Sequence, residues 1–418
     1  MERAKLIVKN FGPLKDIEIE VREMVAFIGA QASGKSTLAK LLSIFEDESF
    51  RKDDEITFED ELKKYNIFSY LNNETYISYE QGSLGLIFRF KLNERKSLKY
   101  NDRENILKKY VESFNNGKDI EDQKLNFDLL VKRDFYFSRY KQKDEKIWDK
   151  IKSKIKSDLD WQQKINLTEF LNIYDKVLAE FSIYVLYDSI YIPTERNFLH
   201  LIAENTLGLI NNNVQIPKHL LNSGQDYEKA LQTIKELPLS IIDKKLQYKR
   251  EGKTSYIYHN ENEKVDLLES ASGLQSIIPI LLLVEYSKSL NDEYNFNFVV
   301  EEPELNLYPK AQHELIKYLV KNCLFDRKNL ILTTHSPFIL ASINNLLLAY
   351  DKGQTKPKEV NKIIKKESWL NPKNFIAYEL KNGKARLIMD DKLGQIKENM
   401  IDIISDDFSN EFDKLLDL

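Results

Sequence analysis

An eight-residue segment near the N-terminus constrains the fold of this chain more than any other feature of its sequence. Residues 29–36 read Gly-Ala-Gln-Ala-Ser-Gly-Lys-Ser and fit the phosphate-binding pattern G-x-x-x-x-G-K-[ST]. An apolar run, 24–28, precedes the segment, and a helix-like run, 36–45, follows it. We therefore expect a buried strand, a tight loop and a helix, as in an α/β nucleotide-binding fold, rather than an isolated glycine-rich turn.

The chemistry of this loop predicts ATP and Mg²⁺ as cofactors. Backbone N–H groups of such a loop and of the helix after it surround phosphate oxygens. Lys35 would add a positive charge at the β- and γ-phosphates, and the Ser36 hydroxyl would bind Mg²⁺. The predicted ATP-binding residues are Gly29, Ala30, Gln31, Ala32, Ser33, Gly34, Lys35, Ser36 and Thr37.

Two adjacent carboxylates end a second apolar run. Residues 298–300 are followed by Glu301 and Glu302, so a buried strand would end with both acids near the phosphates. Glu301 is predicted to hold Mg²⁺ together with Ser36, and Glu302 is predicted to polarise the attacking water as the catalytic base. Acidic residues also follow many surface strands, and Glu304 is the alternative base, but the position after a phosphate-binding loop favours catalysis by Glu302.

Two further motifs stand at fixed places around this acid pair. Residues 270–275, Ser-Ala-Ser-Gly-Leu-Gln, open an apolar helix about 30 residues before it, and a helix N-terminus with small residues favours an anion. The apolar strand-like run 329–334 ends at His335. Serine-glycine helix starts and histidines at strand ends are common, so the order of the motifs matters more than each motif alone.

The hydrophobic pattern divides the chain into three parts. Residues 1–94 contain two hairpin-like alternations, and 183–418 alternate between helix and strand patterns, as in a parallel α/β sheet. Residues 95–182 are rich in Lys, Asp, Glu and Asn, and Ile147, Ile151 and Ile155 recur every four residues. This spacing predicts a helical insertion between two halves of one nucleotide-binding domain. Its basic cluster, 150–156, is either a solvated helix face or a nucleic-acid contact.

Composition excludes several other classes of protein. One cysteine, Cys323, cannot form an internal disulfide or a cysteine zinc cluster. The formal net charge of −4 does not indicate binding to nucleic acid by the whole molecule, so any such contact would use a local basic patch. The longest apolar run, 277–284, is shorter than the roughly 20 residues of a membrane span, and the first residues lack the core of a signal peptide. We therefore expect a cytoplasmic protein without a membrane partner.

Taken in order, these motifs resemble those of the ABC/SMC ATPase superfamily, over roughly 1–90 and 183–418. The resemblance implies a mixed sheet with a phosphate-binding core, an antiparallel lobe and an inserted helical subdomain. It also implies that Ser270, Ser272, Gly273 and Gln275 form the signature motif, which covers the γ-phosphate bound by a second subunit. His335 would be the histidine that contacts the γ-phosphate and completes catalysis. A homodimer or higher homo-oligomer with ATP between two heads follows from this resemblance.

Two motifs look more specifically like those of OLD-type ATPases of the AAA_15 and AAA_21 kind. These are residues 301–309, Glu-Glu-Pro-Glu-Leu-Asn-Leu-Tyr-Pro, and 334–337, Thr-His-Ser-Pro. Glu301 stands where SMC proteins and transporters usually carry aspartate. Full-length OLD enzymes also carry a Toprim nuclease, but the 83 residues after His335 contain no glutamate followed by an Asp-x-Asp strand end, and the pair Asp390-Asp391 is expected to form a turn. We expect no intrinsic nuclease activity.

Three segments are similar to those of the ATPase subunits of PARIS anti-phage systems: the phosphate-binding loop 29–36, the stretch 336–347 and the segment 410–416. This similarity implies a sensor or scaffold that controls a separate, Toprim-like effector nuclease and responds to a phage-encoded trigger protein. The first rival is a RecF- or SMC-like DNA-repair ATPase that binds duplex DNA. The second is a transporter subunit, which the Glu-Glu-Pro-Glu motif and the large insertion disfavour.

Two segments leave alternatives open. Residues 191–196, Tyr-Ile-Pro-Thr-Glu-Arg, resemble the start of a nucleotide-sensing loop, but Thr194 stands where glutamine is usual. Thr194, Glu195 or Arg196 would sense nucleotide there, unless Thr194 only caps a helix. The acidic segment 398–418 contains apolar residues at helical spacing. It is either a docking or head-closing helix or a terminal helix packed on its own domain.

Overall fold

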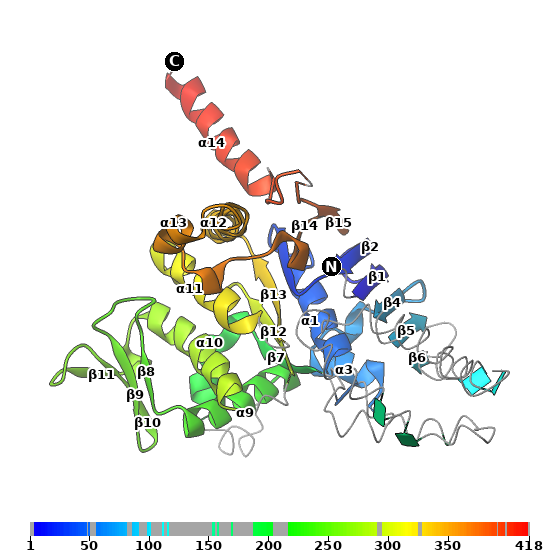
Figure 1. Cartoon of the computed structure of the whole chain (residues 1–418), viewed down its shortest axis with the longest axis horizontal. Coiled ribbons are helices and arrows are strands. Elements are labelled where there is room, and N and C mark those ends of the chain that lie inside the picture. Colours follow the sequence, from blue (N-terminus) through cyan, green and yellow to red (C-terminus); the bar gives the residue numbers. More distant parts are fainter. Residues whose placement is uncertain are drawn as a thin grey trace.

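The computed structural model shows how the strands and helices around the motifs are arranged (Figure 1). Most of the predicted insertion, 95–182, lies outside the described residues, as do the three isoleucines and all of its basic cluster except Lys154. The residues described are 4–47, 49–50, 56–81, 86–91, 98–101, 111–112, 115–116, 153–154, 157–158, 169, 187–203, 216–290, 295–324, 328–390, 392–397 and 399–416.

A mixed sheet of eleven strands forms the centre of the described chain, with the order β6-β5-β4-β1-β2-β15-β14-β3-β13-β12-β7. This sheet confirms the predicted α/β class. Its strands are β1 (Ala4–Phe11), β2 (Leu14–Val21), β3 (Met24–Gly29), β4 (Tyr76–Gln81), β5 (Leu86–Lys91), β6 (Leu98–Asn101), β7 (Tyr187–Ile192), β12 (Asn295–Glu301), β13 (Lys328–Thr334), β14 (Phe375–Lys381) and β15 (Lys384–Leu387).

The half of the sheet that carries the phosphate-binding loop is parallel. β7, β12, β13, β3 and β14 pair in parallel, each with the next. Every residue of β3 is buried, which suits a strand covered on both faces and explains its unbroken apolar run. The helices of this half are α1 (Lys35–Glu46), α9 (Lys218–Thr233), α10 (Ser272–Ser289), α11 (Pro309–Cys323), α12 (Pro337–Gly353) and α13 (Pro357–Ile363).

The other half of the sheet is an antiparallel lobe. β1 pairs with β2 and β4, and β4, β5 and β6 follow by antiparallel pairing. Alternate residues of β1 and β2 are buried, as the period of a half-exposed strand requires. Helix α3 (Phe58–Lys64) packs here, where Phe45 of α1 joins an aromatic cluster with Phe58 and Phe88. Strand β6 lies within the first residues of the predicted insertion and extends this lobe.

A hairpin from the last fifth of the chain joins the two halves. β14 pairs in parallel with β3 over six residues, β14 pairs with β15, and β15 contacts β2 through Lys384 and Asp16. No pattern in the sequence indicated that this hairpin lies between β3 and β2. Gly383, at the hairpin turn, has φ of +77°, and a Cβ there would lie 2.6 Å from Lys15 Cγ. Only glycine fits this turn without strain.

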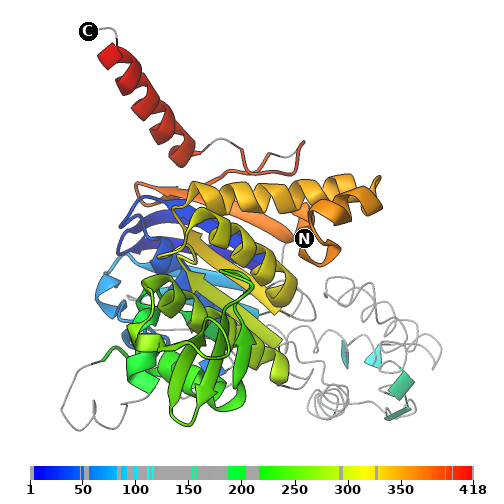
Figure 2. The same ribbon diagram turned by 90° about the vertical axis from the view of Figure 1, so that its left-hand side faces the viewer.

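A smaller sheet and a terminal helix complete the described chain. The second sheet contains β8 (Glu236–Pro238), β9 (Gln247–Glu251), β10 (Thr254–Tyr258) and β11 (Lys264–Asp266) in the order β11-β10-β9-β8. Helix α14 (Met400–Leu416) rises away from the rest of the protein, as a view from the side also shows (Figure 2). Among the helices described, none is both long enough and apolar enough to cross a membrane.

Short 3₁₀ segments connect these elements: η1 (Phe68–Tyr70), η3 (Thr194–Phe198), η4 (Leu267–Glu269), η5 (Lys366–Ser368) and η6 (Pro372–Asn374). Two of them bear on earlier expectations. η3 begins directly after Pro193, which is its N-cap residue, so Thr194 does not cap a helix as one alternative supposed. The Thr194 hydroxyl instead donates a hydrogen bond to Glu195 Oε2 at 2.9 Å. Further along, Asp390 Oδ1 accepts the N–H groups of Lys392 and Leu393, which confirms a turn at that residue.

Candidate nucleotide-binding site

The loop between β3 and α1 has a backbone that only a few residue types adopt. Ala32 has φ of +59° and Gly34 has φ of +99°, so successive N–H groups turn toward one side of the loop. A Cβ on Gly34 would lie 2.4 Å from Leu14 Cδ2, and one on Gly29 would lie 2.7 Å from Leu380 O. Gly34 is required by its positive φ, and Gly29 is required by its close approach to a backbone oxygen. The loop ends at the N-terminus of α1, the arrangement that binds phosphate.

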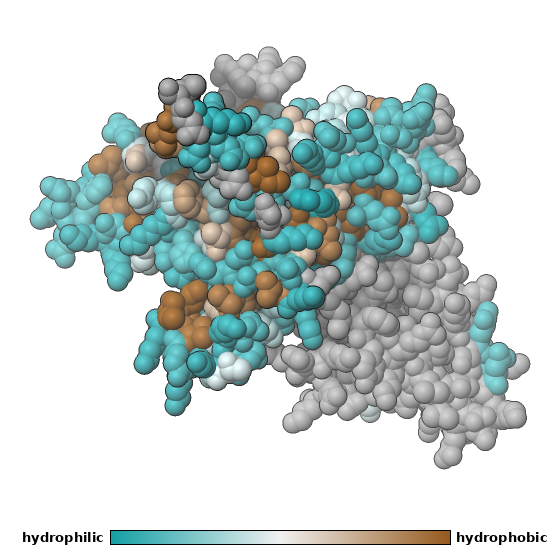
Figure 3. Space-filling model, turned by 90° about the horizontal axis from the view of Figure 1, so that it is seen from above, coloured by the Kyte–Doolittle hydropathy of each residue, from teal (hydrophilic) through white to brown (hydrophobic). Residues whose placement is uncertain are grey.

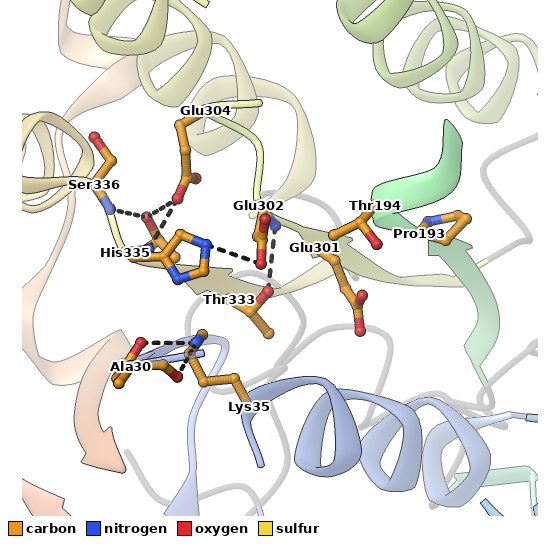
Figure 4. Close-up of polar contacts among 12 residues, drawn as sticks. Ala30, Lys35, Pro193, Thr194, Glu301, Glu302, Glu304, Thr333, His335 and Ser336 are labelled. Atoms are coloured by element: carbon orange, nitrogen blue, oxygen red, sulfur yellow. Dashed lines mark hydrogen bonds and ion pairs between the residues drawn. The ribbon is translucent and has the colours of Figure 1, made fainter. Parts of the chain in front are cut away.

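Lys35 turns back onto this loop. Its Nζ donates hydrogen bonds to Gly29 O at 2.7 Å and Ala30 O at 2.9 Å, and the residue is 5% exposed (Figure 4). Burial lowers the Lys35 pKa, and the carboxylates of Glu302 and Glu304 oppose that shift. The ammonium group thus lies in the loop, beside two acidic side chains, with carbonyl partners that a phosphate oxygen could replace.

Glu301 is a buried carboxylate at the end of β12. Its Oε1 accepts a hydrogen bond from Tyr191 Oη at 2.8 Å. Burial raises the Glu301 pKa, and hydrogen bonds from Tyr191 and Ser36 oppose this shift. The pairing of Ser36 with Glu301 supplies two oxygen donors of the kind that Mg²⁺ prefers. Within the described ranges, no group of three or more His, Cys, Asp and Glu side chains could hold a metal alone, so nucleotide and water oxygens would have to complete such a site.

Glu302 lies beside the loop in a strained backbone conformation. Its φ is +43°, and its N–H donates to Thr333 O at 2.9 Å. Its Oε1 is 2.9 Å from His335 Nε2 (Figure 4). The hydrogen bond from His335 lowers the Glu302 pKa, and the same contact raises the His335 pKa. A non-glycine residue in the left-handed region costs about 1–3 kcal/mol and persists where surrounding bonds hold it. Such strain is typical of functional sites.

Glu304 positions the end of β13 rather than facing the loop. Its Oε1 accepts the Thr334 hydroxyl at 2.8 Å and the His335 N–H at 2.9 Å. Its Oε2 is buried and has no hydrogen-bond partner among the described residues. Burial raises the Glu304 pKa, with the His335 N–H acting against that shift. The acidic residue that the sequence offered as an alternative base thus holds the backbone of the histidine.

Arg196 links the ends of two strands and a helix through hydrogen bonds to main-chain carbonyl oxygens. Its side chain is completely buried, and its guanidinium donates only to main-chain carbonyl oxygens. Nε donates to Ser276 O at 2.9 Å, Nη1 to Glu301 O at 2.8 Å and to Pro193 O at 3.2 Å, and Nη2 to Glu302 O at 2.7 Å. Burial lowers the Arg196 pKa to about 10, so the group remains charged at neutral pH. One side chain therefore links β7, β12 and the first turn of α10.

The predicted signature residues lie at the start of α10. Ser272 is its first residue and is exposed, while Gln275 Nε2 donates to Leu268 O and Ser270 O, both at 2.9 Å. A Cβ on Gly273 would lie 2.8 Å from Asn306 O, so this helix start packs on the loop after the acid pair. In the described part of the chain, no hydrogen bond joins these residues to the phosphate-binding loop of the same chain.

The structure thus brings together Lys35, Glu302 and His335, with Ser36 and Glu301 beside them, and keeps the signature residues separate. Tyr191 contributes to this arrangement and had no role assigned from sequence, whereas Arg196 and Glu304 have other contacts here than their predicted roles, a nucleotide sensor and an alternative base, suggested. The other two candidates for nucleotide sensing do not link the strand ends as Arg196 does. Glu195 is exposed, and the hydrogen bond that the Thr194 hydroxyl donates goes to Glu195. The run 193–196, Pro-Thr-Glu-Arg, was the one sequence pattern that pointed to a functional role for Arg196.

One family model matches most of this chain, and several solved structures are similar to it. The family model for the AAA ATPase domain matches residues 1–340. No curated protein matches the chain significantly. The SMC head domain from Thermotoga maritima is similar over 93% of this chain and 98% of its own, with 11% identity and a TM-score of 0.37. An SMC head bound to the C-terminal winged-helix domain of ScpA covers 92% and 96%, with 9% identity and a TM-score of 0.40. The recombination mediator RecF covers 93% and 98%, with 13% identity and a TM-score of 0.32.

Proposed function

Since the chain belongs to the AAA ATPase domain family, we propose that it binds ATP at 29–37 and hydrolyses it with Glu302 as the catalytic base. The observation that carries this assignment is the position of the Glu302 carboxylate, which faces His335 and interacts with Lys35. A carboxylate with a lowered pKa is ionised at neutral pH and can orient a water molecule and take up its proton. Glu301 has a different role, because its carboxylate is buried against Tyr191.

The other residues around the loop would each contact a different part of the nucleotide or its Mg²⁺. Lys35 would exchange its two carbonyl partners for β- and γ-phosphate oxygens, and the backbone N–H groups of the loop would hold the remaining oxygens. Ser36 and Glu301 would hold Mg²⁺, which stabilises the negative charge of the phosphates when it is bound. His335 would leave Glu302 and contact the γ-phosphate, so the state of the nucleotide would determine which partner the imidazole has.

The separation of the signature residues supports a two-headed arrangement. Ser272 is exposed at the start of α10, where a helix N-terminus favours a phosphate. We infer that it covers the γ-phosphate of ATP held by a second copy, so two heads close on two nucleotides. Arg196 would connect this contact to Glu302, because it bonds both to Ser276 of the signature helix and to the Glu302 carbonyl.

The cellular role that we propose is control of a separate effector nuclease in bacterial anti-phage defence. It rests on the similarity to OLD-type ATPases in 301–309 and 334–337, and on the similarity to PARIS ATPase subunits in the phosphate-binding loop, 336–347 and 410–416. ATP-dependent closure of two heads would hold the effector, Toprim-like in this proposal, until a phage-encoded trigger protein changes the complex. Such a protein would work in the cytoplasm.

The substitution Glu302→Gln tests the catalytic assignment. It keeps the size and the hydrogen-bonding capacity of the side chain but removes the negative charge, so ATP should bind with parental affinity. Hydrolysis should slow by roughly 10²-fold or more, the usual effect of losing a positioned base. Phosphate release and nucleotide affinity are measured on the same preparation, with the exposed Glu359→Gln as a control. A parental rate in Glu302→Gln would assign the base elsewhere, first to Glu304.

The effector proposal has a test of its own. The purified chain should hydrolyse ATP and leave DNA and RNA intact with Mg²⁺ or Mn²⁺. Coexpressed with the product of its neighbouring gene, it should copurify as a stable complex. Metal-dependent cleavage by this chain alone, lost on substitution of Asp390 and Asp391, would contradict the proposal.

A second candidate function is that of a RecF- or SMC-like ATPase that binds duplex DNA. One observation favours it: five exposed lysines lie close in sequence on and after α13, at 356–366. DNA binding through them would weaken steeply with salt, because phosphate contacts release counterions. Affinity for a DNA duplex measured at two salt concentrations distinguishes this candidate.

A further inference from the structure

Beyond its first turn, helix α14 carries an apolar face that the rest of the described chain leaves uncovered. At 3.6 residues per turn, its six apolar residues on this face fall within about 120° of the helix circumference. Phe408 is 68% exposed and Phe412 62%, and the side chains toward the C-terminus are equally open. A solvated helix of this kind is far less stable alone than with its apolar face buried. The residues of this face are Ile401, Ile404, Phe408, Phe412, Leu415 and Leu416.

The start of α14 is fixed to the head, in contrast to its exposed body. The Met400 N–H donates to Glu379 Oε2 at 3.0 Å, and Asn399 Oδ1 accepts the N–H of Ile401 at 3.0 Å. Ile401 also packs partly against the core. Both ribbon views show the helix pointing away from the head beyond this root (Figures 1 and 2). The alternative that α14 packs on its own domain is therefore wrong for all but its first turn.

The remaining faces of α14 are acidic. Residues 400–416 contain five acids and one lysine, a net charge of −4: Asp402, Asp406, Asp407, Glu411, Asp413 and Lys414. A partner for this helix must offer an apolar surface edged by positive charge. Pairing of α14 with α14 of a second copy does not meet this condition, because it brings two net charges of −4 together.

The head itself presents such a surface around α13. Residues 356–366 contain five lysines and one glutamate, a net charge of +4, and all five lysines are exposed. None of the five forms an ion pair with a described residue. Ile363 lies among them and is 81% exposed, and Leu348 of the neighbouring α12 is also exposed. Seen from above, the described part of the protein is mostly hydrophilic, with smaller apolar patches that the view does not assign to single elements (Figure 3). The lysines are Lys356, Lys358, Lys362, Lys365 and Lys366.

We propose that α14 of one copy docks on the α13 surface of a second copy, and that the second copy returns the same contact. Phe408 and Phe412 would cover Ile363 and Leu348, while the acids of α14 would face the lysines of 356–366. The charges of the two surfaces are equal and opposite, which favours this partner over a second α14. This contact uses neither the phosphate-binding loop nor the signature residues. The copies would therefore associate without nucleotide.

Two charge-reversed full-length chains test this interface. One carries Lys362→Glu and Lys366→Glu; the other carries Asp407→Lys and Glu411→Lys. Each pair of substitutions alone would reduce the net charge of one surface to zero and so remove its attraction to the other surface. Sedimentation velocity without nucleotide should then show loss of the parental self-association. Mixed in equal amounts, the two chains present complementary surfaces again and should form mixed dimers. Recovery only in the mixture shows that the contact joins two copies.

Every other outcome of this experiment contradicts the interface. If α14 folds back on α13 of its own chain, mixing restores nothing. If the lysines bind DNA instead, the reversed-lysine chain loses duplex affinity while the parental chain remains monomeric without DNA. The control Lys244→Glu with Lys245→Glu makes the same charge change at two exposed lysines far from α13 and should leave the mass unchanged. Phe408→Ser with Phe412→Ser should also abolish association while ATP hydrolysis by the head persists.

Discussion

Two buried cations, Lys35 and Arg196, lie near the ends of the parallel strands and are held in the same way. Both donate hydrogen bonds to main-chain carbonyl oxygens, and for both burial lowers the pKa. They differ in how completely they are enclosed. Lys35 has two carbonyl partners on a loop whose Ala30 is exposed, whereas Arg196 has four partners on three separate segments and no exposed surface.

This difference in enclosure indicates different roles, phosphate recognition for Lys35 and structural support of the site for Arg196. A lysine on a flexible stem can leave two carbonyls and move to a phosphate, while the planar fork of an arginine fixes the groups around it. We infer that Lys35 acts on the ligand and that Arg196 maintains the positions of the residues that act. Substitutions of the two should therefore affect different measurements.

The largest effect is expected from Lys35→Ala. It removes the charge that compensates the β- and γ-phosphates, so ATP binding should be lost. The free energy of unfolding should fall less than in Arg196→Lys, because the Lys35 side chain makes two hydrogen bonds to carbonyl oxygens and Arg196 makes four. Isothermal titration with ATP and urea unfolding measure the two quantities. Undiminished affinity would contradict the role of Lys35, and a large loss of stability would remove its contrast with Arg196.

The next largest effect is expected from Arg196→Lys. Lysine keeps the charge but cannot reproduce four hydrogen bonds in fork geometry, so buried carbonyls lose their donors. Each such carbonyl costs about 1–3 kcal/mol, and the free energy of unfolding should fall by about 3 kcal/mol or more. ATP affinity in the folded fraction should stay near the parental value, while turnover falls. Weakened binding at parental turnover would show that Arg196 contacts nucleotide instead.

The smallest effect is expected from His335→Ala, and it depends on pH. The His335 pKa is raised in the folded protein, so its contribution to stability is complete below the ordinary histidine pKa and is lost as pH rises through the folded value. The Glu302 pKa is lowered, so its contribution is present above its ordinary value and disappears only in stronger acid. Because both side chains are partly exposed, the pair should contribute less than about 1 kcal/mol.

Urea unfolding at pH 6 and pH 8 measures this contribution. The parental chain should be more stable than His335→Ala at pH 6, and the difference should shrink at pH 8. His259→Ala, at an exposed histidine, should show no such change. A difference that grows with pH would contradict the assignment of the raised pKa to the contact with Glu302.

The parts of the site that the sequence could predict are those with local patterns. The loop 29–36 and the strand ends at Glu301 and His335 are defined by neighbouring residues, so spacing and periodicity were enough to find them. Arg196 differs, because its partners at Ser276, Glu301 and Glu302 are 80, 105 and 106 residues away in sequence. Such contacts follow from the packing of the sheet, and no short pattern records them.

The same reasoning applies to the fold. Alternation in 1–22 and 75–90 predicted the strands of the antiparallel lobe, and the apolar runs before the motifs predicted the parallel strands. Pattern does not specify which strands pair at long range, so the position of β14 between β3 and β15 had no sequence signal. The apolar face of α14 was visible in sequence, but its exposure depends on what packs against it.

The hairpin of β14 and β15 also bears on the order in which the protein is synthesised. In the described sheet, it is the only connection between the lobe that ends with β2 and the core that begins with β3. The phosphate-binding loop emerges from the ribosome long before residue 375, and residues 1–340, the part shared with the family, do not include the hairpin. Because Leu380 O packs against Gly29, the loop gains this neighbour only after β14 has been synthesised. A nascent chain should therefore complete its nucleotide site more than 300 residues after the loop itself.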